Sequence, residues 1–283
     1  MAPAPVPDWA PVRGTLVYKM SGSGNDFVVL DGRFTDASRW PAAQIRAICD
    51  RRSGVGADGF VILTPATPDS VRMAYWNADG SHGALCGNAA LCCGRLAVAL
   101  EFVPPGEFCL LTDAGVVRVR AGATGDGAEI NLPDVDLPRE HGGVAAAVGE
   151  RWLSMGSVGV PHLVIRVDDI EAVDVAGRGR LLRSHESVGL EGANVNFVAP
   201  TEGSWLIRTY ERGVEGETLA CGTGTVAAAL ALASRGEARL PLSFRSRGGP
   251  ELSVRADLVG PRATGVWLGG QGRLVFRGVW EGI

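Results

Sequence analysis

Two strongly apolar segments dominate the pattern of hydrophobic and polar positions along the chain. Residues 84–100 contain a single charged side chain, Arg95, and residues 226–233 contain none. A helix that is apolar all round is normally buried, so each segment predicts a helix enclosed by the rest of the fold. The second segment is too short to span a bilayer. Each predicted helix follows a cysteine and a glycine, at Cys86-Gly87 and Cys221-Gly222.

The segments between these helices have the pattern of strands. Residues 71–76 alternate and are predicted to form a strand that ends at Asn77. Further strands are predicted from short apolar or alternating runs at residues 14–19, 27–30, 60–63, 107–111, 116–121 and 273–280. Residues 41–51 have helical character. The stretch from 133 to 143 is rich in Pro, Asp and Gly and is the best candidate for a linker.

The order of motifs recurs after a nearly constant interval. The interval from Cys86 to Cys221, called the repeat interval below, also separates Gly24 from Gly159. It separates Val119-Arg120-Ala121 from Val254-Arg255-Ala256 as well, and Gly192-Ala193-Asn194 follows Gly56-Ala57-Asp58 with a slip of a single position. The repeat predicts an α/β (α+β) fold with two pseudo-symmetric halves. Each half is expected to wrap a mostly antiparallel sheet around its buried helix.

The repeat also predicts how the chain divides into domains. The N-terminal half, with Cys86, is expected to comprise residues 1–136 and 273–283, and the C-terminal half, with Cys221, residues 137–272. Residues 273–280 have no evident counterpart in the first half and are expected to return to it. Residues 1–7 are expected to be a disordered lead-in, because they lack the basic and apolar regions of a signal peptide.

Composition narrows the classes of function. The formal charge of −4 and the absence of a Lys/Arg-rich run argue against nucleic acid as a partner, and no segment predicts a membrane span. Six cysteines without a CxxC pair and four scattered histidines give little support to a zinc site. A chain of this length is not a disulfide scaffold, so we expect a reducing, cytoplasmic setting.

The paired cysteines predict an active site in the cleft between the halves. If both helix starts face one cleft, two thiols stand on opposite sides of one bound molecule. One thiolate can then remove a proton from a stereocentre while the other thiol returns a proton to the opposite face. A helix start favours negative charge and is expected to lower a thiol pKa from about 8.5 to roughly 3.5–7.5. Its free N–H groups can hold a carboxylate.

These residues resemble the diaminopimelate epimerase family, with landmarks from about residue 19 to 270. The resemblance rests on Gly24-Asn25-Asp26-Phe27, Gly56-Ala57-Asp58, Asn77 to Ser81, Cys86-Gly87-Asn88, Gly159 with Pro161-His162, Asn194, Glu211-Arg212-Gly213 and Glu217 to Gly224. It implies a cofactor-independent isomerase, with no metal, that converts LL-diaminopimelate to the meso form for lysine and peptidoglycan synthesis. It also implies a homodimer.

The resemblance assigns roles by matching positions. Cys86 and Cys221 would be the two acid/base residues, and His162 and Glu211 would assist their ionisation. The reacting carboxylate would be held by backbone N–H groups of Gly87, Asn88, Gly222 and Thr223, with Asn25 nearby. Asn77, Asn194 and Arg212 would hold the distal carboxylate, and Glu211 the distal amine.

Three positions depart from the family pattern. Val160 stands where the family has asparagine, Gly59 stands where glutamine is frequent, and the segment between Arg212 and Glu217 carries one extra residue. The substitution at Val160 leaves open how the distal carboxylate is held. None of the three affects the two-thiol chemistry.

Simpler readings remain for single residues. Cys49, Cys92, Cys93 and Cys109 are expected to be core residues, and His162 has a competing reading as a buried core histidine. The asparagines could be turn formers, Glu211 and Arg212 a surface ion pair, and Cys86 with Cys221 a disulfide. A loose GxGxxA match at residues 222–227 gives only weak support to dinucleotide binding.

Other functions also remain open. A two-cysteine racemase could act on another amino acid, such as a proline derivative or histidine. A protein of another class could use the same cleft as a redox-sensing binder or as a metal-dependent enzyme. The first of these alternatives has no need of donors for a distal carboxylate.

Overall fold

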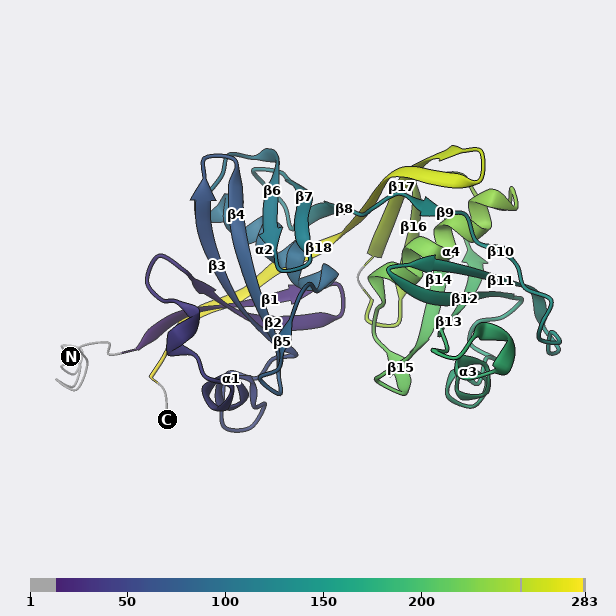
Figure 1. Ribbon diagram of the computed structural model, residues 1–283, viewed down its shortest axis with the longest axis horizontal. Coiled ribbons are helices and arrows are strands. Elements are labelled where there is room, and N and C mark those ends of the chain that lie inside the picture. The colour runs from purple at the N-terminus through teal and green to yellow at the C-terminus, as the bar shows by residue number, and fades with distance from the viewer. Residues whose placement is uncertain (1–13, 250, 282–283) are drawn as a thin grey trace, which may run out of the picture.

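The computed structural model describes residues 14–249 and 251–281, which form two lobes joined side by side (Figure 1). The prediction for residues 1–7 lies outside the described residues. The first lobe contains β1 (Thr15–Gly22), β2 (Asn25–Asp31), a 3-10 turn (Ala37–Arg39), α1 (Ala42–Cys49), β3 (Gly59–Thr67), β4 (Ser70–Asn77), β5 (His82–Gly83), α2 (Gly87–Ala99), β6 (Gly106–Thr112), β7 (Gly115–Ala121) and β8 (Gly127–Asn131).

The second lobe has a matching set of elements. It contains β9 (Val135–Asp136), β10 (Arg139–Glu140), β11 (Glu150–Val158), β12 (Val160–Val167), α3 (Val175–Arg183), a 3-10 turn (Glu186–Val188), β13 (Asn194–Thr201), β14 (Ser204–Glu211), β15 (Gly216–Thr218), α4 (Gly222–Ser234), β16 (Leu242–Ser246) and β17 (Glu251–Val259). The final strand, β18 (Arg262–Trp280), runs through both lobes. Among the described helices, none combines the length and the hydropathy needed to cross a bilayer.

The first lobe is a closed sheet around α2. The pairings run β1–β2–β3–β4–β6–β7–β8–β18 and return to β1, and only β2–β3 and β4–β6 are parallel. The helix is buried along most of its length, as its apolar sequence predicts. Gly94 permits this close packing, because a Cβ there would lie 2.5 Å from Val119 Cγ1. The prediction of a mostly antiparallel sheet around a buried helix is confirmed for this lobe.

The second lobe repeats this arrangement around α4. Its pairings run β10–β11–β12–β13–β14–β16–β17–β18, and the parallel pairs β12–β13 and β14–β16 match those of the first lobe. Phe27 pairs with Gly59, and His162 pairs with Asn194, so both partners recur after the repeat interval. A second apolar cluster lies beside α1 in the first lobe and beside α3 in the second. The fold therefore has a pseudo-two-fold repeat.

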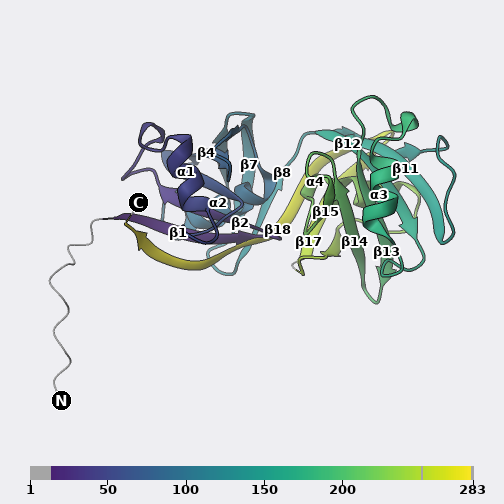
Figure 2. The same ribbon diagram turned by 90° about the horizontal axis from the view of Figure 1, so that it is seen from below.

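The two lobes exchange strands. Residues 272–280 of β18 pair with β1 in the first lobe, while residues 262–269 pair with β17 in the second (Figure 2). The expectation that the last strand has no counterpart is wrong. Arg139 pairs with Met155 just as Leu274 pairs with Met20, and the repeat interval separates both partners. The predicted linker at 133–143 therefore carries β9 and β10, which pair with strands of the second lobe.

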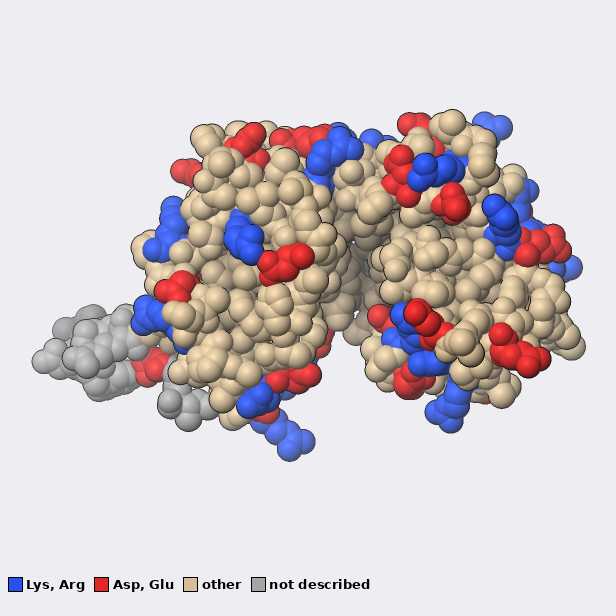
Figure 3. Space-filling model, in the orientation of Figure 1, with Lys and Arg blue, Asp and Glu red and all other residues tan. Residues whose placement is uncertain are grey.

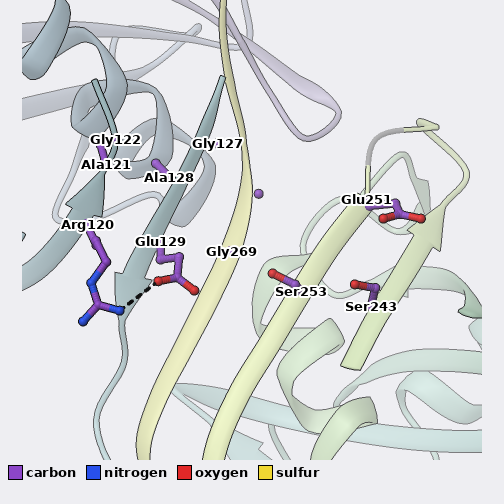
Figure 4. Close-up of a pocket in the computed structure, with 11 residues that line it drawn as sticks. Arg120, Ala121, Gly122, Gly127, Ala128, Glu129, Ser243, Glu251, Ser253 and Gly269 are labelled. Carbon is purple, nitrogen blue, oxygen red and sulfur yellow. Dashed lines mark hydrogen bonds and ion pairs between the residues drawn. The ribbon is translucent and has the colours of Figure 1, made fainter. Parts of the chain in front are cut away.

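A polar contact ties the lobes together where β18 crosses. Glu129 on β8 accepts hydrogen bonds from Arg120 on β7 at 3.3 Å and from Arg255 on β17 at 2.9 Å. Figure 4 shows the first of these beside a hollow of about 450 Å³ between β8, β18 and β17. This hollow contains neither of the two paired cysteines, Cys86 and Cys221, and lies apart from the site described next.

Candidate active site

The two cysteines of the repeat occupy the same position at two helix starts. Cys86 is the N-cap of α2 with φ −130° and ψ 121°, and Cys221 is the N-cap of α4 with φ −131° and ψ 106°. Neither helix has a side-chain cap, so the first-turn N–H groups are free for other acceptors. The N–H groups of Asn88 and Ala89 at the start of α2 favour a thiolate on Cys86, and those of Thr223 and Gly224 at the start of α4 favour one on Cys221.

Both helix starts open onto one cleft of about 740 Å³ between the lobes, where the surface is hollowed (Figure 3). Nine of the residues predicted for the site line this cleft: Asn25, Asn77, Cys86, Gly87, Asn88, Glu211, Cys221, Gly222 and Thr223. The floor and walls are mixed in polarity, with Phe27, Leu85, Ile130, Leu132 and Leu268 supplying apolar surface. The cleft suits a small molecule with several polar groups.

Burial, which was not visible in the sequence, dominates the ionisation of the thiols. Burial raises the pKa of Cys221 to about 12, and the nearby Glu211 carboxylate acts in the same direction. Burial also raises the pKa of Cys86, although N–H groups of α2 oppose the change. Burial therefore outweighs the effect expected of a helix start, and the pKa of each thiol is raised instead of lowered.

The predicted assistants do not promote thiol ionisation in this state. Burial raises the pKa of Glu211, and its negative charge disfavours a thiolate on either cysteine. His162 is fully buried and does not line the cleft. Burial and the charge of Arg212 lower the pKa of His162 to about 3, so this imidazole is neutral and supplies no positive charge.

Side-chain amides form a fixed chain at the α2 side of the cleft. Asn88 Nδ2 donates to Asn25 Oδ1 at 2.7 Å, and Asn25 Nδ2 donates to Asp58 Oδ2 at 3.0 Å. Arg51 in turn donates to Asp58 Oδ1 at 2.6 Å. Asn88 Oδ1 is buried and has no hydrogen-bond partner among the described residues. This chain orients both amides and leaves one buried acceptor beside Cys86.

Two residues predicted for the distal end lie outside the cleft lining. Asn194 is buried, and its Oδ1 accepts from the Arg212 backbone N–H at 2.8 Å. The Arg212 guanidinium donates to the Glu191 backbone carbonyl at 3.1 Å and is not among the residues that line the cleft. Of the predicted donors for a distal carboxylate, the structure brings only Asn77 to the cleft.

Several residues that line the cleft are not among the predicted site residues. Asp58 lies in the Gly56-Ala57-Asp58 motif, and Tyr75 lies in the strand predicted to end at Asn77. Alternation gives a signal for Tyr75, because it lies two positions before Asn77 and so shares its face of β4. Glu217, Thr218, Leu219 and Ala220 complete the wall next to Cys221.

The thiols are available for chemistry. All six cysteines are free, so Cys86 and Cys221 form no disulfide in this structure. Within the described ranges, no group of three or more His, Cys, Asp or Glu side chains is placed to hold a metal ion.

Comparison with known proteins agrees with this geometry. The family model for diaminopimelate epimerase matches residues 17–130 and 155–258, and so includes both helix starts. The chain belongs to the diaminopimelate epimerase family. A relative of that name from Gemmatimonas aurantiaca is 43% identical over 282 residues, covering 94% of this chain and 99% of that protein. Another from Xylella fastidiosa is 38% identical over 279 residues, covering 93% and 95%.

Solved structures outside the diaminopimelate epimerase family share the fold. A PhzF-family phenazine biosynthesis protein from Bacillus anthracis aligns with a TM-score of 0.70 at 13% identity, covering 94% of this chain and 98% of that one. A hydroxyproline epimerase from Agrobacterium vitis, with bound trans-4-hydroxy-L-proline, aligns with a TM-score of 0.63 at 18% identity, covering 94% and 92%. At these identities the likeness concerns the fold alone.

Proposed function

We propose that this protein is an isomerase that interconverts LL- and meso-diaminopimelate without a cofactor, for lysine and peptidoglycan synthesis. The observation that carries the proposal is the pair of cysteines with matching backbone geometry at the starts of two buried helices lining one cleft. Two thiols on opposite walls suit a reaction that removes a proton from one face of a carbon and returns one to the other.

The reacting end of the substrate would lie between the helix starts. Its carboxylate would accept hydrogen bonds from backbone N–H groups of Gly87, Asn88, Gly222 and Thr223, with Asn25 nearby. The positive ends of two helix dipoles would stabilise the charge that spreads onto the carboxylate as the α-proton leaves. The buried, unpaired Asn88 Oδ1 offers an acceptor for the reacting ammonium.

The high thiol pKa values suggest that the substrate itself helps to form the thiolate. Burial raises the pKa of both thiols, and the charge of the Glu211 carboxylate adds to this rise. A substrate ammonium paired with Glu211 would cancel this repulsion. Filling the cleft would also direct the free helix N–H groups at a defined anion. The thiolate would therefore form mainly when substrate is bound, which limits oxidation of the free enzyme.

Recognition of the distal end would begin at Asn77 and Glu211, which both line the cleft. We propose that Asn194 and Arg212 complete the distal carboxylate site after a rearrangement that releases Arg212 from Glu191, because neither reaches the cleft otherwise. This role discriminates a six-carbon diamino diacid from a short substrate such as proline. His162 would support the packing behind Cys221 as a neutral imidazole and would not act as a cation.

We also propose a homodimer that is built on the exposed outer edge of the first lobe. Five large apolar side chains lie half exposed on the paired strands β1 and β18: Leu16, Leu274, Val275, Phe276 and Val279. Large exposed apolar side chains gathered on one pair of strands are typical of a surface covered by a partner, and a second copy of the chain can cover this surface symmetrically. Free thiols favour the reducing cytoplasm. The pairing of residues 272–280 with β1 supports the proposed domains at 1–136 with 273–283 and at 137–272, with the short strand β9 already pairing in the second lobe.

Chiral separation of products tests the proposed reaction. The reduced protein, incubated with LL-diaminopimelate, is expected to yield the meso form, whereas L-proline and trans-4-hydroxy-L-proline stay unchanged. Cys86→Ala and Cys221→Ala should each abolish conversion while keeping the wild-type circular dichroism spectrum. Conversion by either variant at the wild-type rate, or turnover of proline alone, would overturn the proposal.

A further inference from the structure

Tyr75 lines the same cleft as Cys86, and the proposed reaction gives it no role. Of the three tyrosines in the chain, Tyr18 and Tyr210 are buried in the lobes, whereas Tyr75 also lines the cleft. Its hydroxyl donates to Asn77 Oδ1 at 2.9 Å, and Tyr75 and Cys86 line the same cleft, close enough for the hydroxyl to influence the thiol. One hydroxyl thus lies close both to a residue assigned to the distal end and to the thiol at the reacting end.

We propose that Tyr75 is a positioning residue for Cys86, whose hydroxyl supports the thiolate form of Cys86 and links that thiol to Asn77. The inference rests on the proposed function, because it gives Cys86 an acid/base role. It adds a group that neither the sequence reading nor the family resemblance assigned.

The tyrosine ring is held in a fixed slot. A Cβ at Gly59 would lie 2.7 Å from Tyr75 Cε2, and a Cβ at Gly83 would lie 2.6 Å from Tyr75 Cδ1, so both glycines pack directly against the ring. The Phe27 ring meets it edge-on, with centroids 6.3 Å apart. This packing explains the departure at Gly59: a larger side chain there would occupy the space of the Tyr75 ring. The hydroxyl is therefore preorganised, and little side-chain entropy is lost when it engages the sulfur.

The Tyr75 hydroxyl can donate its proton in a hydrogen bond either to Asn77 or to the Cys86 sulfur. Burial raises the pKa of Tyr75 far above its usual value, so the oxygen keeps its proton throughout the physiological range. When Cys86 is a thiol, its S–H can donate to the Tyr75 oxygen while the hydroxyl donates to Asn77. When Cys86 is a thiolate, the hydroxyl can donate to the sulfur instead. No proton leaves the tyrosine in either state, and a hydrogen bond to a charged sulfur is the stronger of the two.

The second thiol lacks an equivalent hydroxyl. Val71 pairs with Leu110, and Trp205 pairs with Phe244, so β4 and β14 hold corresponding places in the two lobes. Counted along these strands from Val71 and Trp205, Tyr75 corresponds to Thr209.

The Thr209 hydroxyl donates to Asn196 Oδ1 at 3.0 Å and not to a cysteine. The Cys221 sulfur instead has the Thr223 hydroxyl at 3.7 Å. The pseudo-symmetry is broken at this position, and only Cys86 is expected to depend on Tyr75.

Alkylation kinetics separate this role from a general effect on the fold. We would follow iodoacetamide labelling of Cys86 and Cys221 in the same sample by peptide mass spectrometry, across pH. In Tyr75→Phe, the pKa of Cys86 should rise by about one to two units, which corresponds to labelling about 10- to 100-fold slower below that pKa. Labelling of Cys221 should be unchanged. In turnover, kcat should fall with a smaller change in KM.

Two further variants keep the test decisive. Tyr18→Phe removes a buried hydroxyl from the same lobe and should leave both labelling rates unchanged. Gly59→Ala displaces the ring but retains the hydroxyl, so it should also slow Cys86 selectively, even if Tyr75→Phe fails to fold. Cys86 labelling that matches the wild type in the folded variants, or equal slowing of both cysteines, would overturn the inference. Labelling requires no turnover, so selective slowing without epimerisation would refute the proposed function and leave the contact intact.

Discussion

Adding one methyl group at Gly224 is expected to disturb Cys221 directly. A Cβ at this position would lie 2.2 Å from Asn196 Oδ1 and 3.2 Å from Cys221 Sγ. Heavy atoms in van der Waals contact are separated by about 3.5 Å, so the first overlap exceeds 1 Å. This overlap does not arise in the first lobe. By the repeat interval, Ala89 corresponds to Gly224 there, and Val61 corresponds to Asn196. An alanine is therefore tolerated at one helix start and excluded at the other.

The size of the effect follows from how firmly Asn196 is held. This side chain is fully buried; its Nδ2 donates to Leu163 O at 3.2 Å, and its Oδ1 accepts from Thr209 at 3.0 Å. Moving it sacrifices hydrogen bonds of about 0.5–1.5 kcal/mol each, whereas leaving it in place forces the start of α4 and Cys221 outward. Overpacking of this kind costs about 1–3 kcal/mol, and the better helix propensity of alanine offsets up to about 1 kcal/mol.

Urea unfolding and epimerase assays test this reasoning together. Gly224→Ala is expected to lower the free energy of unfolding by about 1–2 kcal/mol and to reduce kcat at least tenfold, by moving the Cys221 sulfur. Gly142→Ala, where a Cβ would meet nothing within 4 Å, serves as the matched control and should change neither quantity. Adding Asn196→Ala removes the overlap, so the double variant should be more stable than the sum of the single effects. A Gly224→Ala protein with wild-type stability and rate would refute the argument.

Three other results are expected. Burial alone would raise the pKa of Asp26, but the hydrogen bonds and charges of Arg51 and Lys19 outweigh burial and hold this pKa well below its usual value. Asp26 therefore stabilises the fold above about pH 4, and this contribution is progressively lost as the pH falls. The urea midpoint of Asp26→Asn should lie below that of the wild type at neutral pH and approach it in acid; a gap that does not change with pH would contradict this. Because burial raises the pKa of Cys221 to about 12, alkylation of this thiol should rise about tenfold per pH unit up to about pH 10. A plateau below about pH 9 would show that the thiol is more acidic. Phe276→Asp should raise the dimer dissociation constant at least about tenfold in sedimentation velocity, whereas a wild-type protein that is monomeric at micromolar concentrations would rule out the dimer.

The repeat and its buried helices were legible in the sequence because their signals are long and strong. Two apolar runs, each preceded by Cys-Gly, predicted α2 and α4, and the constant interval predicted two matching lobes. The first part of β18 was missed because Gly265, Gly269 and Gly270 hide its strand pattern. Helix α3 was missed for a similar reason: its sequence includes two glycines, and its start depends on Asp174 capping the Gly177 N–H.

The chemistry of the cleft was only partly predictable. The sequence motifs predicted nine residues that line one cleft in the structure, namely both thiols and seven others. The thiol pKa values were predicted in the wrong direction, because a helix start can be recognised in a sequence but the depth of its burial cannot. The counterpart of the last strand, β10, pairs through only Arg139 and Glu140 and has no alternating pattern to reveal it. Tyr75 required the three-dimensional slot between Gly59 and Gly83.

Deuterium placement in the first turnovers tests the two-thiol account most directly. LL-diaminopimelate would be incubated with the reduced enzyme in deuterated water. At low conversion, substrate and product would be separated, and the deuterium content of each would be measured by mass spectrometry. If one thiol takes the proton and the opposite, solvent-exchanged thiol returns another, each product molecule should carry one α-deuterium while unreacted substrate carries almost none. Product that retains its original α-proton would show that a single group serves both faces, and would contradict the paired roles of Cys86 and Cys221.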